Sequence, residues 1–102
     1  MDRNGVIRAL RANECELRRL GVLSLSLFGS IARGDGNDGS DIDIAIKLDP
    51  EKTPRGLQYL NRIDEIEERL KELLGRHVDV ISEPARKPRF QEQIDRDRVL
   101  AF

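Results

Sequence analysis

Two aspartates separated by one residue, Asp41 and Asp43, are the residues of this sequence best suited to chemistry. They lie in the run Ser40-Asp-Ile-Asp-Ile-Ala-Ile46, in which isoleucines alternate with acidic and small residues. Because successive side chains of a β-strand point to opposite faces, both carboxylates leave one face while the isoleucines bury the other. A third aspartate, Asp79, lies between two valines in a second alternating run. If the two runs form neighbouring strands, the three carboxylates converge.

Such a carboxylate cluster needs compensation. Like charges a few ångströms apart repel by about 1–4 kcal/mol per pair, depending on the effective dielectric. A fold tolerates this with a bound cation or with raised pKa values. Since Mg²⁺ takes carboxylates, waters and substrate phosphates as ligands, the cluster predicts a Mg²⁺ site completed by a nucleotide.

A second candidate feature is Gly29-Ser30, where an alternating run passes into a short helical turn. Glycine lets the backbone approach a ligand closely, and the start of a helix offers free N–H groups to phosphate. Ser30 adds a hydroxyl, and Arg33 adds a cation one turn later. We therefore expect phosphate groups to bind here, opposite the carboxylates.

Each of the weaker candidates also has an ordinary structural interpretation. Arg33 could pair with Asp35 or Asp38 and only order the loop, and Ser40 fits a turn as well as a contact to substrate. Asp79 could be the exposed alternate of a half-buried strand. A lone histidine at a strand start is more often structural, and we interpret His77 in this way although it shares the face of Asp79.

The elements that must position these residues follow from periodicity and from turn-forming residues. We expect the order α-β-α-β-α-β-α, with a short second helix, an α/β (α+β) fold, and a small three-stranded mixed sheet with helices on one face and the other face free. Leu23, Leu25 and Leu27 should share one face of the first strand. The N-terminal half should contain a helix over 4–20, a strand over 22–28, a short helical turn over 31–33 closed by Gly34, and a strand over 41–48. The C-terminal half should contain a helix starting at Thr53-Pro54 and closed by Gly75, a strand over 77–82 and a helix over 91–100.

Composition and charge restrict the class of protein. The 102 residues, 38% of them hydrophobic, suit one domain over 1–102. A net charge of −1 argues against direct nucleic-acid binding. We interpret the locally basic segment 86–98 as a solvated helix face, and the alternative is a docking patch for a partner or for phosphate. One cysteine, no signal-like apolar run and no membrane-length stretch favour a cytoplasmic protein with no membrane contact.

The run Gly29-Ser-Ile-Ala-Arg-Gly-Asp35, followed by Ser40-Asp-Ile-Asp-Ile44, resembles the signature of the DNA polymerase β-type nucleotidyltransferase superfamily. In that signature Gly-Ser is followed by ten residues and then Asp-x-Asp, and residues 29–43 match it in full. The Ala-Arg-Gly-Asp run and the small size resemble the minimal nucleotidyltransferases of prokaryotes more closely. The resemblance covers nearly the whole chain.

The resemblance implies roles for single positions. Asp41 and Asp43 would bind metal, and Asp79 would be a third ligand and a possible base for the attacking hydroxyl. Gly29 and Ser30 would hold the triphosphate, with Arg33 and Ser40 as further nucleotide contacts. Two Mg²⁺ ions would serve the transfer, with ATP as the substrate.

The resemblance also implies a partner. Minimal nucleotidyltransferases are commonly antitoxins beside a helical HEPN-type toxin, and active members transfer AMP from ATP to a tyrosine of that toxin. A chain of this size favours a protein acceptor, because the partner then brings the acceptor surface. The alternatives are an antitoxin that neutralises by binding without catalysis, and a subunit of a small-molecule nucleotidyltransferase.

Overall fold

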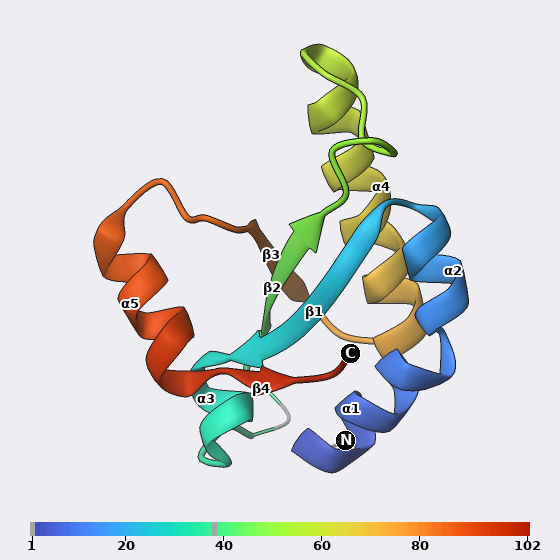
Figure 1. Ribbon diagram of the computed structural model, residues 1–102. Coiled ribbons are helices and arrows are strands. Elements are labelled where there is room, and N and C mark those ends of the chain that lie inside the picture. Colours follow the sequence, from blue (N-terminus) through green and yellow to red (C-terminus); the bar gives the residue numbers. More distant parts are fainter. Residues whose placement is uncertain (1, 38) are drawn as a thin grey trace.

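The computed structural model describes residues 2–37 and 39–102, and these form helices and strands in alternation (Figure 1). The N-terminal half contains α1 (Arg3–Ala12), α2 (Glu14–Arg19), β1 (Val22–Phe28), α3 (Gly29–Arg33) and β2 (Ile42–Leu48). The C-terminal half contains α4 (Leu57–Leu74), β3 (Val78–Ser82), α5 (Pro88–Asp97) and β4 (Val99–Leu100).

The strands form one mixed sheet in the order β3-β2-β1-β4. β2 runs parallel to β3, while β1 is antiparallel to both β2 and β4. The predicted α+β fold with a mixed sheet is confirmed, but the count of three strands is wrong. The last helix ends at Asp97, and the residues after it pair with the free edge of β1. There Leu25 donates to the Phe102 carbonyl and accepts from Ala101, which satisfies backbone groups that an edge strand would leave open.

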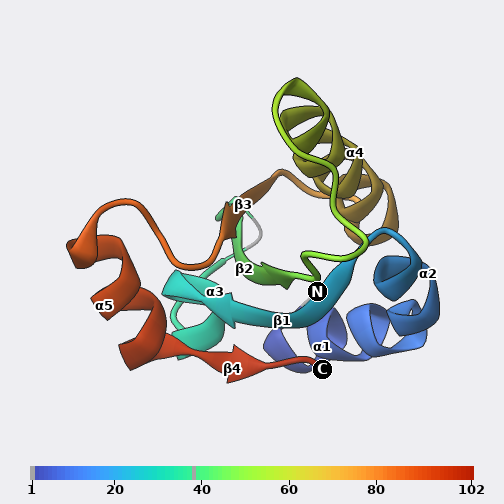
Figure 2. The same ribbon diagram turned by 45° about the horizontal axis from the view of Figure 1, so that its top comes forward.

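Helices cover both faces of the sheet (Figure 2). α1, α2 and α4 lie on the face that buries Leu25, Ile44 and their neighbours, whereas α5 lies on the opposite face. The expectation that all helices share one face is therefore wrong. Phe28 and Ala45 are apolar residues of the second face, and the fully buried Ile94 of α5 covers them. The end of this face that carries the aspartates is exposed at Asp41 and Asp79.

The predicted first helix is two helices. Asn13 leaves the helical conformation, and its side-chain amide donates to the Ala9 carbonyl at 2.8 Å. This bond satisfies a carbonyl that the end of α1 leaves open. α4 begins at Leu57 after Gly56, not at Thr53-Pro54, because Gly56 adopts a φ of +70° at the helix entry. Its predicted end at Gly75 is confirmed.

The first strand contains an irregularity that the alternation of its residues hides. Its register with β2 shifts between Val22 and Ser24, so Val22 is buried and Leu23 is 47% exposed. Leu25 and Leu27 lie in the core as predicted. Leu23 does not lie in the core with them, because the bulge turns the Leu23 side chain toward solvent. No helix in the described part of the chain is long and apolar enough to cross a membrane.

Candidate active site

The register of the sheet brings the predicted carboxylates together at one end. In the ladder Asp43 lies opposite Phe28 of β1 on one side and opposite Asp79 of β3 on the other. Neighbouring strands lie roughly 5 Å apart, and paired residues point to the same face. Asp41 precedes Asp43 by two residues and shares its face. The two predicted strands are therefore neighbours, and the three aspartates lie side by side.

The carboxylates of this group repel one another. The pKa of Asp43 is raised above its ordinary value, first by burial and then by the charges of Asp79 and Asp41. The guanidinium of Arg33 lowers it, but only in part. A divalent cation among these carboxylates would remove the repulsion and favour the ionised forms.

Gly29 at the start of α3 lies directly against the Asp43 carboxylate. It has a φ of +73°, and a Cβ atom placed on it would lie 2.2 Å from Asp43 Oδ2. No side chain fits in that space. The backbone of the Gly29-Ser30 corner is thus in van der Waals contact with the Asp43 carboxylate. The turn expected to bind phosphate therefore lies beside the carboxylates expected to bind metal.

Arg33 and Ser40 are engaged with other residues. Arg33 pairs with Asp35 at 3.2 Å and with Asp97 of α5 at 2.9 Å. The alternative pairing with Asp38 lies outside the described residues. The Ser40 hydroxyl accepts from the Asn37 N–H at 3.0 Å and so closes the turn before Asp41. Both contacts agree with the structural interpretations, although the charge of Arg33 also reaches Asp43.

Two residues between α4 and β3 contribute features that sequence reasoning missed. Arg76 donates through Nη2 to the Asn37 carbonyl at 2.8 Å and also to the Ser40 carbonyl, so it anchors the loop that leads into Asp41. His77 is exposed, and its Nε2 lies 3.4 Å from Asp79 Oδ1. Burial does not support a packing role for His77. In the sequence, the only sign that His77 belongs to the site is that it shares a strand face with Asp79. No pattern in the sequence indicates the contacts of Arg76.

The donor atoms at this end of the sheet suit a cation. Asp41, His77 and Asp79 each offer a ligand atom, and these atoms lie within 4.8 Å of one another. Asp43 lies behind them, half-buried. Carboxylate oxygens are the ligands of hard divalent ions, and imidazole nitrogen is a ligand of transition ions, so this group suits a divalent cation.

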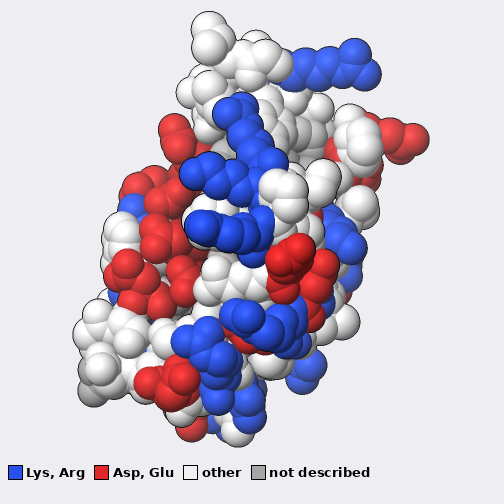
Figure 3. Space-filling view, turned by 90° about the vertical axis from the view of Figure 1, so that its left-hand side faces the viewer, with Lys and Arg blue, Asp and Glu red and all other residues white. Residues whose placement is uncertain are grey.

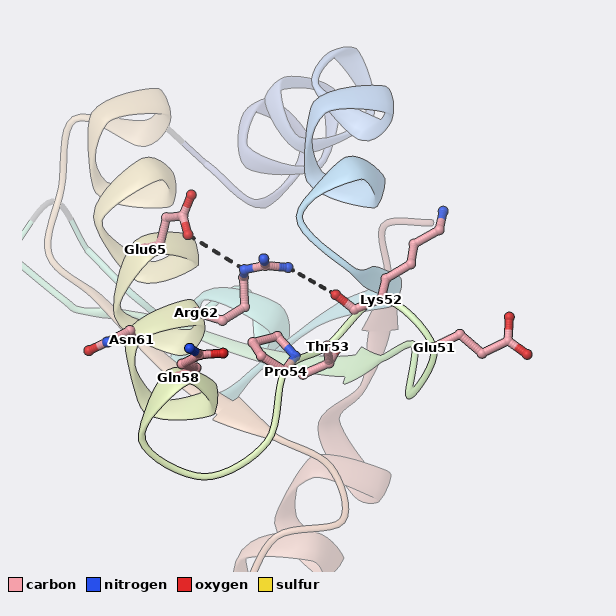
Figure 4. A pocket seen from close by; sticks show the side chains of 8 residues that line it. All are labelled: Glu51, Lys52, Thr53, Pro54, Gln58, Asn61, Arg62 and Glu65. Atoms are coloured by element: carbon pink, nitrogen blue, oxygen red, sulfur yellow. Dashed lines mark hydrogen bonds and ion pairs between the residues drawn. The ribbon is translucent and has the colours of Figure 1, made fainter.

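An open hollow at the other end of the sheet is a separate feature (Figure 4). It lies between the loop after β2 and the first turns of α4, roughly 20 Å from the aspartates by the length of a seven-residue strand. Arg62 crosses it, donating to the Lys52 carbonyl at 3.2 Å and pairing with Glu65 at 3.5 Å. Those contacts hold the loop to α4, and the hollow contains no part of the carboxylate group.

The surface over α5 carries a band of basic side chains beside acidic ones (Figure 3). This agrees with the basic segment seen in the sequence. Arg98, however, is turned inward and donates to Ser26 and Glu83, so it does not contribute to a solvated helix face.

Comparison with known proteins places this geometry in context. The family model described as "Nucleotidyltransferase domain" matches residues 9–101. A curated relative from Thermococcus cleftensis, "Protein adenylyltransferase MntA", is 36% identical over 91 residues, which is 88% of this chain and 86% of the relative.

Solved structures give the same result for the fold. A structure described as a candidate minimal nucleotidyltransferase has 32% sequence identity and a TM-score of 0.74, covering 97% of this chain and 95% of that chain. A toxin–antitoxin complex with AMP-PNP contains a chain with a TM-score of 0.64 and 22% identity, covering 100% of this chain and 73% of that chain. At that identity the second likeness speaks for the fold alone.

Proposed function

The chain belongs to the nucleotidyltransferase domain family, and from this premise we propose that it transfers AMP from ATP to a hydroxyl of a partner protein, as the antitoxin of a toxin–antitoxin pair. The observation that carries the proposal is the contact between Gly29 and the Asp43 carboxylate. A triphosphate held at the Gly29-Ser30 corner lies within reach of the three aspartates. The similarity to a protein adenylyltransferase supports a protein as the acceptor.

Asp41, Asp43 and Asp79 would hold two Mg²⁺ ions. When bound, such ions neutralise charge on the phosphates and stabilise the attacking and leaving oxygens. The raised pKa of Asp43, caused by burial and then by its two acidic neighbours, supports this assignment. Positive charge beside Asp43 would favour its ionised form.

The chain's own residues would bind and orient the reactants. Backbone N–H groups of Gly29 and Ser30 and the Ser30 hydroxyl would hold the triphosphate. The hydroxyl oxygen of the acceptor forms a bond to the α-phosphorus, the bond from that phosphorus to the bridging oxygen of the β-phosphate breaks, and pyrophosphate leaves. The hydroxyl proton passes to Asp79, which is exposed and so accessible to an acceptor from outside. Arg33 and Ser40 stay proposed nucleotide contacts, with Arg33 favoured because its charge already acts on Asp43.

The proposed partner is a HEPN-type toxin, with a tyrosine as the acceptor. The family resemblance supports this identity, and the surface offers a place for a protein to dock. Leu57 and Leu60, at the start of α4, are 81% and 57% exposed. Large apolar side chains exposed side by side are typical of a protein-binding surface.

The test uses the purified chain, the protein encoded by the adjacent gene, ATP and Mg²⁺. Intact-mass spectrometry should find AMP on the partner, and peptide fragmentation should find it on tyrosine. Asp41→Asn and Asp43→Asn should abolish the mass shift. Asp64→Asn, an exposed position on α4, is the matched control and should transfer as wild type does.

Two outcomes would contradict the proposal. A partner that stays unmodified with the wild-type chain rules out the transfer. Neutralisation of the toxin in cells by the Asp41→Asn/Asp43→Asn double variant would mean that binding alone is sufficient, which is the non-catalytic alternative.

A further inference from the structure

The parallel pairing of β2 and β3 places four side chains together on one face of the sheet: Asp41, Asp43, His77 and Asp79. Asp43 lies opposite Asp79, and Ile42 lies opposite Val78. The Ile42 N–H donates to the His77 carbonyl at 3.1 Å, so the ladder continues one step further. His77 is thereby held beside Asp41, just as Asp79 is held beside Asp43.

His77 is available for a ligand. Its side chain, just before the edge strand β3, is 57% exposed, and it pairs with Asp79, whose side chain is itself 53% exposed. An exposed pair of this kind contributes little to stability, so packing does not explain the position. The ligand atoms of Asp41, His77 and Asp79 lie within 4.8 Å of one another. Two ligand atoms on one ion lie at most about 4.2 Å apart, given metal–ligand bonds of about 2.1 Å, so small rotations of exposed side chains complete the set.

The mixed donor set is chemically different from a purely carboxylate site. Mg²⁺ takes oxygen ligands and keeps several waters. First-row transition ions accept imidazole nitrogen together with carboxylate oxygen. A histidine inside the cluster therefore changes which ion the cluster prefers.

We propose that His77 joins Asp41 and Asp79 as a metal ligand and makes this site prefer a transition ion, probed here as Mn²⁺, over Mg²⁺. The inference rests on the proposed function, because it concerns the same cation. It adds a nitrogen ligand and an ion preference to that function.

The experiment uses the untagged chain without nucleotide and takes advantage of a single histidine in the sequence. Electron spin echo modulation of bound Mn²⁺ should show coupling to an imidazole ¹⁴N, which can come only from His77. Titration followed by the loss of the free Mn²⁺ signal gives the affinity. His77→Gln should lose the ¹⁴N coupling and weaken Mn²⁺ binding roughly tenfold or more, while Mg²⁺ affinity by calorimetry should change by less than about twofold.

Bound Mn²⁺ without imidazole coupling in the wild type would overturn the inference, as would equal Mn²⁺ affinity in His77→Gln or no Mn²⁺ binding at millimolar concentration. Asp41→Asn is the control and should weaken both ions. Transfer of AMP is scored separately on the partner. If AMP is transferred but His77 does not ligate, only this inference fails; if the metals bind and no AMP is transferred, the proposed function fails.

Discussion

At the scale of single residues, Gly29 carries two independent constraints. Its φ of +73° disfavours any side chain, and the Asp43 carboxylate occupies the place where a Cβ would lie. The first constraint concerns stability and the second concerns the position of a proposed catalytic group. Substitutions at two glycines can separate these constraints, because Gly75 has a positive φ but no atom near the place of its Cβ.

We predict that Gly29→Ala loses transfer activity and a small amount of stability. The added methyl group must displace the Asp43 carboxylate, and a shift of about 1 Å in such a group costs about a hundredfold in rate. The positive φ adds a cost of about 1–2 kcal/mol in the free energy of unfolding. Initial rates of AMP transfer and urea denaturation measure the two effects.

Gly75→Ala is the matched control. Gly75 has a φ of +66°, and nothing lies within 4 Å of a Cβ placed there. It should lose similar stability and keep its transfer rate. If both variants transfer AMP equally well, the contact between Gly29 and Asp43 has no catalytic importance.

At the scale of elements, a polar network fastens α5 to the sheet. Arg98, just after α5, donates to Ser26 of β1 at 3.1 Å and to both oxygens of Glu83. Gln91 of α5 donates to Glu83 at 3.0 Å. The Glu83 side chain is only 4% exposed. Because these bonds join α5 and the residue after it to β1 and to the residue that follows β3, they hold the helix on the second face of the sheet.

We predict that Glu83→Gln destabilises the chain by about 1–3 kcal/mol at pH 7. Burial raises the pKa of Glu83, but hydrogen bonds from Arg98 and Gln91 and the charge of Arg98 outweigh it, so the pKa lies below its ordinary value of 4.5. A lowered native pKa means that the stabilisation is complete above pH 4.5 and is lost as the pH falls through the native pKa. The gap between wild type and variant in urea denaturation should therefore narrow below about pH 4.5.

Glu92→Gln, an exposed position on the same helix, serves as the comparison. It should match the wild type in stability across the whole pH range. A constant gap between wild type and Glu83→Gln from pH 7 to pH 3.5 would mean that the charge of Glu83 is not what fastens α5.

At the scale of the whole molecule, α4 is divided between the core and the surface. Ile66, Leu70 and Leu74 are buried against the sheet, whereas Leu57 and Leu60 are exposed. In Figure 1 the first turns of α4 extend beyond the end of the sheet. The apolar stripe of α4 thus has a buried part and an exposed part, since the sheet is shorter than the helix that crosses it.

We propose that residues 1–102 form a single domain and predict one cooperative unfolding transition. Leu70 has no exposed surface, so Leu70→Ala should cost about 2–5 kcal/mol through lost burial and a cavity. Leu57→Ala should change stability by less than about 0.5 kcal/mol. Thermal unfolding by calorimetry measures both. Two separate transitions, or equal effects of the two variants, would contradict this description.

The sequence by itself determined the local chemistry of the site. The alternation around Asp41 and Asp43 placed both carboxylates on one face, because a strand has a strict period of two. The pairing of Gly29 with Ser30 at the end of a strand indicated a phosphate corner, since glycine at such a corner allows close approach. Strand β2, most of α4 and the end of α4 at Gly75 follow from the same local rules.

Only the tertiary structure decided which of these segments meet. The pairing of β4 with β1, the bulge at Leu23 and the position of α5 on the second face depend on an open strand edge and on apolar surface that no local pattern displays. The same holds for Arg76, which holds the loop before Asp41, and for His77, which the β2–β3 register sets beside Asp41. Periodicity is a property of one segment, but register and contact are properties of two segments, and the folded chain alone brings those together.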